Sequence, residues 1–175
     1  MNMKTVLVTG PIGSGKSEVC RYLASKGFPV YDCDSRTKGL YESVPGLKSR
    51  IERALDIKWE QLPVIFTDSA RREALEHIVY PLVVRDILDW KSGLRADAAF
   101  IESAIAMQKK VFDGLYDEVL LVTADASVRR GRNPKAAQRD ALQTFDLPGI
   151  RHVIENNSSI EELHRKTDEI LCRLI

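Results

Sequence analysis

Short apolar runs and longer amphipathic stretches alternate along this chain. The apolar runs are a few residues long and end in Gly, Pro, Asp or Asn, which is typical of strands buried on both faces of a parallel sheet. Five runs have this character, the last more weakly than the others: Lys4–Gly10, Phe28–Tyr31, Ala98–Ala104, Asp117–Asp125 and Ile150–Asn156. The pattern therefore predicts five strands separated by helices.

Helical spacing of apolar residues appears after the first run and again at the end of the chain. In the first helix Val19 and Leu23 share one face, and Gly27 is placed to end it. A closing amphipathic helix carries six residues on or near one face: Ile160, Leu163, Thr167, Ile170, Leu171 and Leu174. These two helices have the apolar stripe needed to cover a sheet.

Residues from Arg36 to about Trp90 also have a mainly helical pattern. Asp68 or Ser69 is a candidate N-cap for the longest helix in this region. We expect Pro81 to kink or break that helix, because proline removes a backbone donor and clashes with the preceding turn.

The alternation of strands and helices predicts the fold class. It favours a three-layer α/β/α domain over residues 1–175, with a five-stranded parallel sheet covered on both faces. Ligands in such sheets bind beyond the carboxyl ends of the strands. Asp32, Asp34, Glu102 and the segment after Asp125 are all expected at that edge, together with the residues that follow the first strand.

Those residues are GPIGSGKS, from Gly10 to Ser17. The string fits G-x-x-x-x-G-K-[ST], in which glycines let successive backbone N–H groups converge on phosphate oxygens. Lys16 is expected to reach the β- and γ-phosphates of ATP, and the Ser17 hydroxyl to ligate Mg²⁺. The candidate nucleotide-binding residues are Gly10, Pro11, Ile12, Gly13, Ser14, Gly15, Lys16, Ser17 and Glu18.

The context of this string supports the nucleotide interpretation. A strand precedes it and a helix follows it, in the order that the phosphate site requires. The alternative is a glycine turn in an ordinary α/β protein. The sequence favours a site for ATP.

Two acidic residues after the second strand are candidates for chemistry. Asp34 is the candidate catalytic base, because it is placed just past a strand that we expect to neighbour the glycine loop. Asp32 is a candidate metal residue that would hold Mg²⁺ through water, or it caps the next helix. For either residue, the alternative to a chemical role is a structural one, in which the aspartate only stabilises the turn at the end of the strand. Glu102, at the end of its strand, is a further candidate carboxylate that would face either the metal or the substrate.

A basic segment follows the fourth strand. The basic pattern of residues 127–139 predicts a short lid whose arginines close over the triphosphate. The alternative interpretation is a basic helix face exposed to solvent. Spacing does not decide which of the basic residues reaches the phosphates; we take Arg139 as the candidate catalytic arginine. The candidates are Arg129, Arg130, Arg132, Lys135 and Arg139.

Charge and composition exclude several classes of function. The formal net charge is +1, so no overall field favours nucleic acid or an anionic membrane. No apolar stretch has the length of a membrane span or a signal segment. Cys20, Cys33 and Cys172 form no CxxC pair, so neither a zinc site nor a disulfide framework is indicated. We expect a cytoplasmic protein.

Several stretches, in the right order, resemble the dephospho-CoA kinases. TGPIGSGKSEV resembles the TGGIGSGKS start of that family, GFPVYDCDS its G-x-x-V-x-D-A-D stretch, REALEHIVYPLV its L-x-x-I-x-H-P-x-V helix, and HVIENNSS its V-I-x-N-x-G segment. The resemblance covers nearly the whole chain. It implies a P-loop kinase of the nucleoside-monophosphate-kinase type that phosphorylates the ribose 3′-hydroxyl of dephospho-CoA with ATP.

The resemblance also implies roles for individual residues. Asp34 takes the place of the family's base, and Asn156 lies near the adenine. The helical stretch of about residues 36–90 is expected to be an insertion that binds the acceptor.

The chain departs from the family pattern mainly on the acceptor side. Tyr80 replaces a histidine of the family pattern, and Ser158 replaces a glycine. The stretch IESAIAM takes the place of a Pro-Leu-Leu-x-E stretch, and the lid region is about ten residues shorter than in the family. Two alternatives therefore stay open. One is a P-loop kinase of another nucleotide or small metabolite, and the other is a nucleotide-binding paralogue without catalysis.

Overall fold

The computed structural model describes residues 3–140, 145 and 149–175. The chain divides into two compact units. The sheet unit comprises Met1–Asp32 and Leu94–Ile175, and the helical unit comprises Cys33–Gly93. The expected helical insertion at about residues 36–90 falls inside the helical unit.

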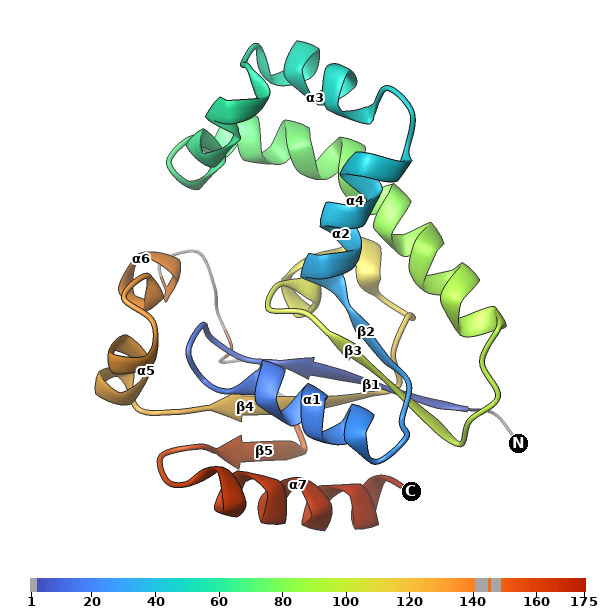
Figure 1. Ribbon diagram of the computed structural model, residues 1–175, viewed down its shortest axis with the longest axis vertical. Coiled ribbons are helices and arrows are strands. Elements are labelled where there is room, and N and C mark those ends of the chain that lie inside the picture. Colours follow the sequence, from blue (N-terminus) through green and yellow to red (C-terminus); the bar gives the residue numbers. More distant parts are fainter. Residues whose placement is uncertain (1–2, 141–144, 146–148) are drawn as a thin grey trace. The chain divides into compact units, whose positions relative to one another are not determined.

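The sheet unit contains five parallel strands (Figure 1). Their order is β2-β3-β1-β4-β5. The strands are β1 (Lys4–Thr9), β2 (Val30–Asp32), β3 (Ala98–Glu102), β4 (Glu118–Thr123) and β5 (His152–Glu155). The α/β class and the five-stranded parallel sheet are therefore confirmed, including the weakest strand, β5.

One expectation about neighbouring strands is wrong. The strand that leads to Asp34 was expected beside the glycine loop, but β2 pairs with β3, and β3 alone separates it from β1. Consequently Glu102, at the end of β3, is next to the strand that feeds the loop, whereas Asp32 is one strand further away. Apolar patterning marks which segments are strands, but it does not order them within a sheet.

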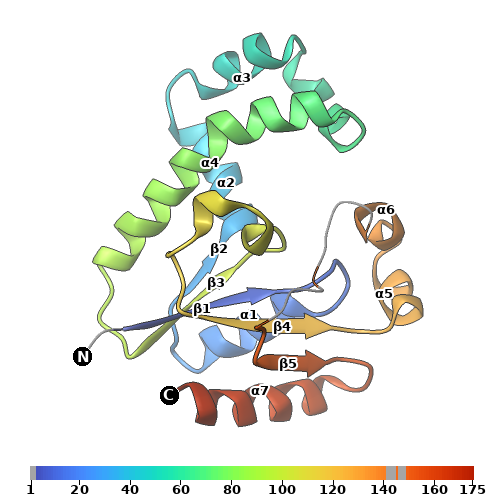
Figure 2. The same cartoon turned by 180° about the vertical axis from the view of Figure 1, so that it is seen from behind.

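Helices α1 (Lys16–Ser25) and α7 (Ile160–Leu174) pack together against the sheet (Figures 1 and 2). Their apolar faces share one core with alternate residues of the strands, in which Leu23, Phe100 and Leu163 are almost fully buried. Gly27 has a φ of 91° just past α1, as expected of a residue that ends a helix. Ile160, however, is 56% exposed, because it lies at the first position of α7 and outside the packed stripe.

Short helical segments complete the sheet unit. Between β3 and β4 lie two 3₁₀ turns, η2 (Ala106–Gln108) and η3 (Lys110–Phe112). After β4 come α5 (Ala126–Arg132) and α6 (Ala136–Asp140), which cover the predicted lid segment. The lid function itself stays a prediction.

The helical unit contains α2 (Cys33–Ser43), α3 (Leu47–Leu55), the 3₁₀ segment η1 (Trp59–Phe66) and α4 (Ser69–Ser92). Helix α4 packs against the other three elements, and Asp68 caps it by accepting a 3.0 Å hydrogen bond from the Arg71 amide. The cap predicted at Asp68 or Ser69 is thus Asp68. Arg36 of α2 and Asp86 of α4 form a two-pronged ion pair, with both N–O distances at 2.8 Å.

Pro81 was expected to kink or break helix α4; it does not break it, although the ribbon of α4 changes direction partway along its length (Figures 1 and 2). Helix α4 continues from Ser69 to Ser92 through the proline. A proline removes only one hydrogen bond of the ladder, and buried residues on both sides of it, including Val79 and Val83, hold α4 in place. Packing therefore outweighs the local cost.

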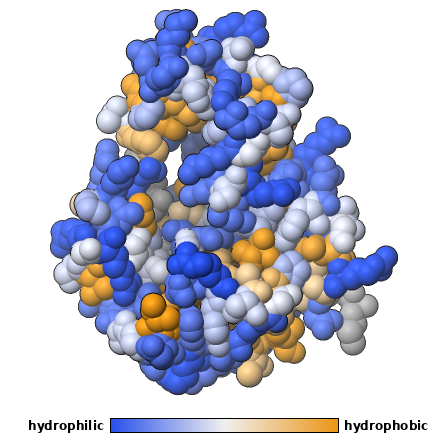
Figure 3. Space-filling view, in the orientation of Figure 1, coloured by the Kyte–Doolittle hydropathy of each residue, from blue (hydrophilic) through white to orange (hydrophobic). Residues whose placement is uncertain are grey.

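Hydrophilic residues dominate the face seen in Figure 3, and the apolar residues on it lie in separate groups. Among the residues described, none of the helices has the length and apolar character to cross a membrane.

Candidate nucleotide site

The glycine loop, Gly10–Ser17, joins β1 to α1 and requires glycine at its fixed positions. Gly15 has a φ of 102°, and a Cβ there would lie 2.2 Å from the Asn156 Nδ2. A Cβ at Gly10 would lie 1.9 Å from the Val122 carbonyl oxygen. Neither approach is possible for a residue with a side chain, so the sequence GPIGSGKS makes a close-packed backbone cradle here.

Helix α1 begins at Lys16 without a capping side chain. Its N-cap residue is Gly15, which has no side chain to accept hydrogen bonds from the first turn. The first-turn N–H groups are therefore available to an anion, and the helix dipole adds partial positive charge at the same point. The positive charge of Lys16 stands at this helix end, as the motif predicts.

Ser17 and Glu102 bring two oxygen donors together beside the loop. The Ser17 hydroxyl donates a 2.5 Å hydrogen bond to Glu102 Oε1. Glu102 ends β3, and its register partners are Val8 on β1 and Asp32 on β2. The sequence marked Glu102 only as a carboxylate at a strand end, because its contact with Ser17 depends on the strand order.

The oxygen donors of Ser17 and Glu102 suit a small hard cation that retains several water ligands when it binds. No group of three or more His, Cys, Asp or Glu side chains able to hold a metal occurs in the described ranges. Mg²⁺ in phosphate-transfer sites does not need such a cage, since it is bound by one or two protein oxygens together with waters and substrate phosphates. Ser17 and Glu102, with Asp32 on the adjacent strand end, fit that mode of binding.

The Cys20 thiol is buried one turn along α1 from Lys16 and Ser17. Burial raises the pKa of this thiol well above its usual value, and the carboxylates of Glu102 and Asp32 raise it further, while Lys16 opposes them. Cys20 is consequently a neutral, buried thiol.

Two residues far along the chain hold the loop. The Asn156 side chain is buried and donates a 2.8 Å hydrogen bond from Nδ2 to the Ser14 carbonyl. Arg132 donates from Nη1 to the Gly13 carbonyl at 3.2 Å and from Nη2 to the Asn156 carbonyl at 3.0 Å. We call Arg132 and Asn156 the loop clip. The sequence marked both residues but predicted neither contact.

Arg129 has a structural part in the same region. It is 8% exposed, and its guanidinium binds both carboxylate oxygens of Asp140, at 2.8 and 3.0 Å. It also donates to the carbonyls of Ala124 and Ile12, at 3.1 and 3.4 Å. The hydrogen bonds from Arg129 hold the pKa of the Asp140 carboxyl below its usual value. This arginine thus joins α5 and α6 to the glycine loop.

The remaining candidates in the sheet unit are placed as follows. Arg139 lies half-buried on α6, and its part in catalysis stays a prediction. Glu18, in the first turn of α1, pairs with Arg21 at 2.6 Å and with His164 at 3.1 Å. These two partners lower the pKa of the Glu18 carboxyl. Only the Glu18 backbone, therefore, is suited to a phosphate.

The residues predicted for the acceptor side belong to the helical unit. Asp34 is exposed in the first turn of α2, two residues after the end of β2. Tyr80, half-buried on α4, donates a 3.2 Å hydrogen bond to Glu76 Oε1 of the same helix. Burial first, and the nearby Glu76 carboxylate second, raise the pKa of the Tyr80 hydroxyl far above its usual value. Tyr80 is therefore a neutral phenol.

The glycine cradle, the uncapped start of α1 and the Ser17–Glu102 pair at the end of a parallel sheet define a P-loop kinase. Comparison with known proteins gives the family. The family model described as "Dephospho-CoA kinase" matches residues 4–172. The chain belongs to the dephospho-CoA kinase family.

Individual relatives agree with the family model. The chain is 34% identical to the dephospho-CoA kinase of Porphyromonas gingivalis over 139 residues, which cover 74% of this chain and 68% of that one. It is 31% identical to that of Thermus thermophilus, over 95% of this chain and 90% of the other. A Thermus thermophilus crystal structure matches with a TM-score of 0.80 and 28% identity over the whole of both chains. Shikimate kinase of Acinetobacter baumannii, at a TM-score of 0.57 and 16% identity, shares the fold.

Proposed function

We propose that this chain transfers the γ-phosphoryl group of ATP to the ribose 3′-hydroxyl of dephospho-CoA, giving CoA and ADP in CoA biosynthesis. The observation that carries the proposal is the glycine loop at the start of α1 with its Ser17–Glu102 pair, in a chain of this family. Phosphoryl transfer passes through a loose transition state, so catalysis comes mainly from positioning and charge neutralisation. The site supplies both.

The chain's own residues divide this work. The loop amides and Lys16 bind the β- and γ-phosphates, while the loop clip of Arg132 and Asn156 keeps the loop backbone in its binding conformation. A preformed cradle does not have to be ordered when ATP arrives, and this favours affinity.

We further propose that Ser17 and Glu102 hold Mg²⁺, with Asp32 acting through water. When bound, Mg²⁺ would supply positive charge that neutralises the transferring phosphoryl group. Glu102 orients the Ser17 hydroxyl, because the 2.5 Å hydrogen bond fixes the direction of that group.

On the acceptor side, Asp34 orients the 3′-hydroxyl and accepts its proton, and Arg139 balances charge from the lid. The motif position of Asp34 and its exposed carboxylate at the start of α2 support the first assignment. The position of Arg139 on α6, next to the Arg129–Asp140 pair, supports the second.

The direct test is ADP release from ATP with and without dephospho-CoA. We expect release to depend on dephospho-CoA and the product to carry a 3′-phosphate. If another acceptor alone stimulates release, the chain is a P-loop kinase of different specificity. If ATP binds but no acceptor stimulates release, the chain is a nucleotide-binding protein without turnover. Either result would contradict the proposal.

The metal assignment has its own test. Glu102→Gln removes the charge that holds Mg²⁺ and orients Ser17, so the Mg²⁺ concentration needed for half-maximal activity should rise by at least the roughly 10- to 100-fold that losing even an outer-shell partner costs. Glu161→Gln, on the exposed start of α7, is the matched control. An unchanged Mg²⁺ requirement in a folded Glu102→Gln variant would remove Glu102 from the metal site.

A further inference from the structure

Strand β5 is one of the two edges of the sheet, and its exposed face carries charges of both signs. Among the described strands, β5 pairs only with β4. Arg151, Val153 and Glu155 are exposed, whereas Ile154 is buried in the core that α1 and α7 cover. Because side chains alternate along a strand, Val153 and Glu155 share the face opposite to that core, and the same alternation extended to Arg151, directly before β5, adds this residue to that face. Along the chain, this edge face therefore presents a basic, an apolar and an acidic side chain in turn.

The backbone of the same three residues points away from β4. The Asn156 amide donates to the Thr123 carbonyl of β4 at 2.7 Å, so residues of the same parity as Asn156 face β4. The N–H and C=O groups of the alternate residues then face the open side of the sheet. These outward groups belong to Arg151, Val153 and Glu155, the residues that form the edge face.

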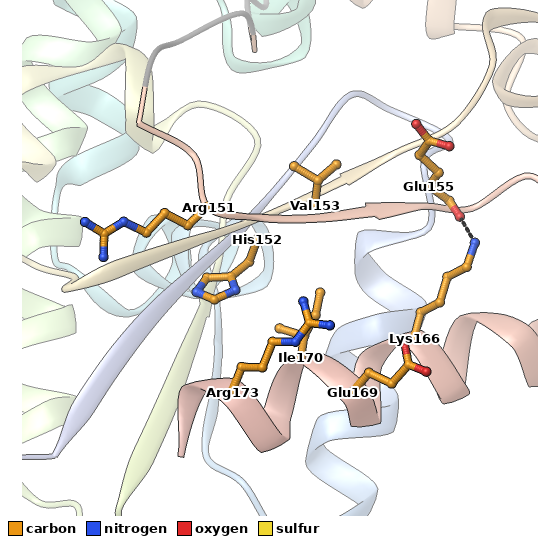
Figure 4. Close-up of a pocket in the computed structure, with 8 residues that line it drawn as sticks. All are labelled: Arg151, His152, Val153, Glu155, Lys166, Glu169, Ile170 and Arg173. Carbon is orange, nitrogen blue, oxygen red and sulfur yellow. Dashed lines mark hydrogen bonds between the residues drawn. The ribbon is translucent and has the colours of Figure 1, made fainter.

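A groove of about 410 Å³ lies against this edge and extends to α7 (Figure 4). It is lined by β5 and by Lys166, Glu169 and Arg173 of the helix. Lys166 donates to the Glu155 carbonyl at 2.8 Å, drawn as a dashed line in Figure 4. A carbonyl oxygen has two lone pairs, so this contact leaves the Glu155 carbonyl able to accept a second hydrogen bond.

We propose that this edge pairs with the β5 edge of a second copy of the chain, which would make one ten-stranded sheet from two five-stranded ones. The two strands run antiparallel about a twofold axis through Val153. In that register Val153 faces its own counterpart, and Arg151 of each copy faces Glu155 of the other. Val153 and Glu155 of each β5, with Arg151 directly before it, then form hydrogen-bonded pairs.

Charge complementarity selects a second copy over another occupant. Charged residues on an edge strand normally prevent pairing, because an incoming strand leaves them unmatched. Here the order Arg-Val-Glu is matched by its own reverse, so two copies form two opposite-charge pairs. The strand is only four residues long, which indicates a weak dimer rather than an obligate one.

The test is sedimentation velocity over micromolar to millimolar protein concentrations, with charge reversal on the edge. Arg151→Glu alone and Glu155→Arg alone each place like charges in both pairs, and should weaken self-association roughly tenfold or more. An equimolar mixture of the two variants restores opposite charges, so a mixed dimer should form. Arg95→Glu makes the same change of charge in the exposed loop before β3 and should have no effect.

A second variant tests the backbone pairing. Val153→Pro removes an N–H that faces away from β4, so the β4–β5 ladder is kept while the pairing with a second copy is lost. The proposal is overturned if the wild type is a monomer at every concentration. It is equally overturned if it dimerises but the reversed variants and their mixture behave alike. Kinase activity does not enter this readout, so the outcome is independent of the proposed function.

Discussion

The glycine loop of the sheet unit and Tyr80, in the predicted acceptor region of the helical unit, differ in the contacts that the structure gives them. The loop is fixed from far along the chain, by Asn156, Arg132 and Glu102. Tyr80, by contrast, bonds to Glu76 one turn earlier in its own helix. A residue that many distant parts hold in place resists substitution, whereas one with a local partner can be exchanged at small cost. The comparison predicts that substitutions in the glycine loop cost more than substitutions at Tyr80.

The largest effect is expected at Lys16. Lys16→Ala should abolish detectable kinase activity and weaken ATP binding, because it removes the positive charge at the start of α1. The fold should survive, since the loop backbone is held by other residues. Calorimetry of ATP binding together with an activity assay provides the measurement, and Lys26→Ala, just past the end of the same helix, is the control. Unchanged ATP affinity in a folded variant would contradict the assignment.

The next effect concerns Asp34, the predicted base. Asp34→Asn keeps the shape but removes the charge and the proton acceptor, so turnover should fall by about 10²- to 10⁴-fold. ATP affinity should change little, and Asp32→Asn should cost less. Steady-state kinetics with both substrates decides this, and Asp89→Asn on the exposed side of α4 is the matched control. Near-normal turnover would move the role of base to another carboxylate, with Glu102 the first to examine.

A smaller effect is expected at Tyr80. Tyr80→His places an imidazole beside the Glu76 carboxylate, which favours the protonated form, and a charged donor can meet a phosphate. A charge-assisted contact is worth about 1.5–3 kcal/mol, so dephospho-CoA should bind about ten- to a hundredfold more tightly.

The measurement at Tyr80 is the KM for dephospho-CoA beside that for ATP. Tyr80→Phe is the control, since it removes only the hydroxyl and should leave both constants close to those of the wild type. Equal affinity in the histidine variant and the wild type would show that this position does not contact the acceptor.

The smallest effect concerns pH and the Arg129–Asp140 pair. The pKa of Asp140 is depressed in the folded state by Arg129, so the pair stabilises the fold above the unfolded pKa of about 4. This contribution is lost as the pH falls through the lower, folded pKa. The Asp140 side chain is 38% exposed, which screens the pair and keeps the effect small.

Urea unfolding at several pH values measures this contribution. The difference in unfolding free energy between the wild type and Asp140→Asn should shrink toward acid pH. Asp97→Asn, in the exposed loop before β3, should show no such trend. A difference that is independent of pH would mean that Asp140 acts by packing and not by charge.

The sequence predicted the glycine loop well because the motif is a local pattern that records where glycine is needed, although the atoms that exclude a Cβ belong to Val122 and Asn156. Gly10 and Gly15 are needed where a Cβ would meet backbone or side-chain atoms, and the motif records that need directly. The five strands could also be predicted, because strands buried on both faces are short and apolar. Asp68 as a cap and Gly27 as a helix end follow from the same local rules.

Contacts between distant segments could not be predicted in the same way. The insertion of β3 between β1 and β2 depends on which strands pair, and it places Glu102 rather than Asp32 beside Ser17. Arg132 was one of several basic residues on a helix, and spacing does not tell which of them meets the Gly13 carbonyl. The break expected at Pro81 does not occur, because packing of the whole of α4 outweighs one lost hydrogen bond.

The strand order has a consequence for how this enzyme family can diversify. Residues 33–93 leave the sheet at the end of β2 and return to it at β3, and these two strands are hydrogen-bonded neighbours. The helical unit is thus an excursion between two adjacent points of the scaffold. Its length and surface can change across generations without altering the register of any strand, or the Ser17–Glu102 pair. On the prediction that this unit binds the acceptor, selection for a new phosphoryl acceptor has a separate stretch of gene on which to act.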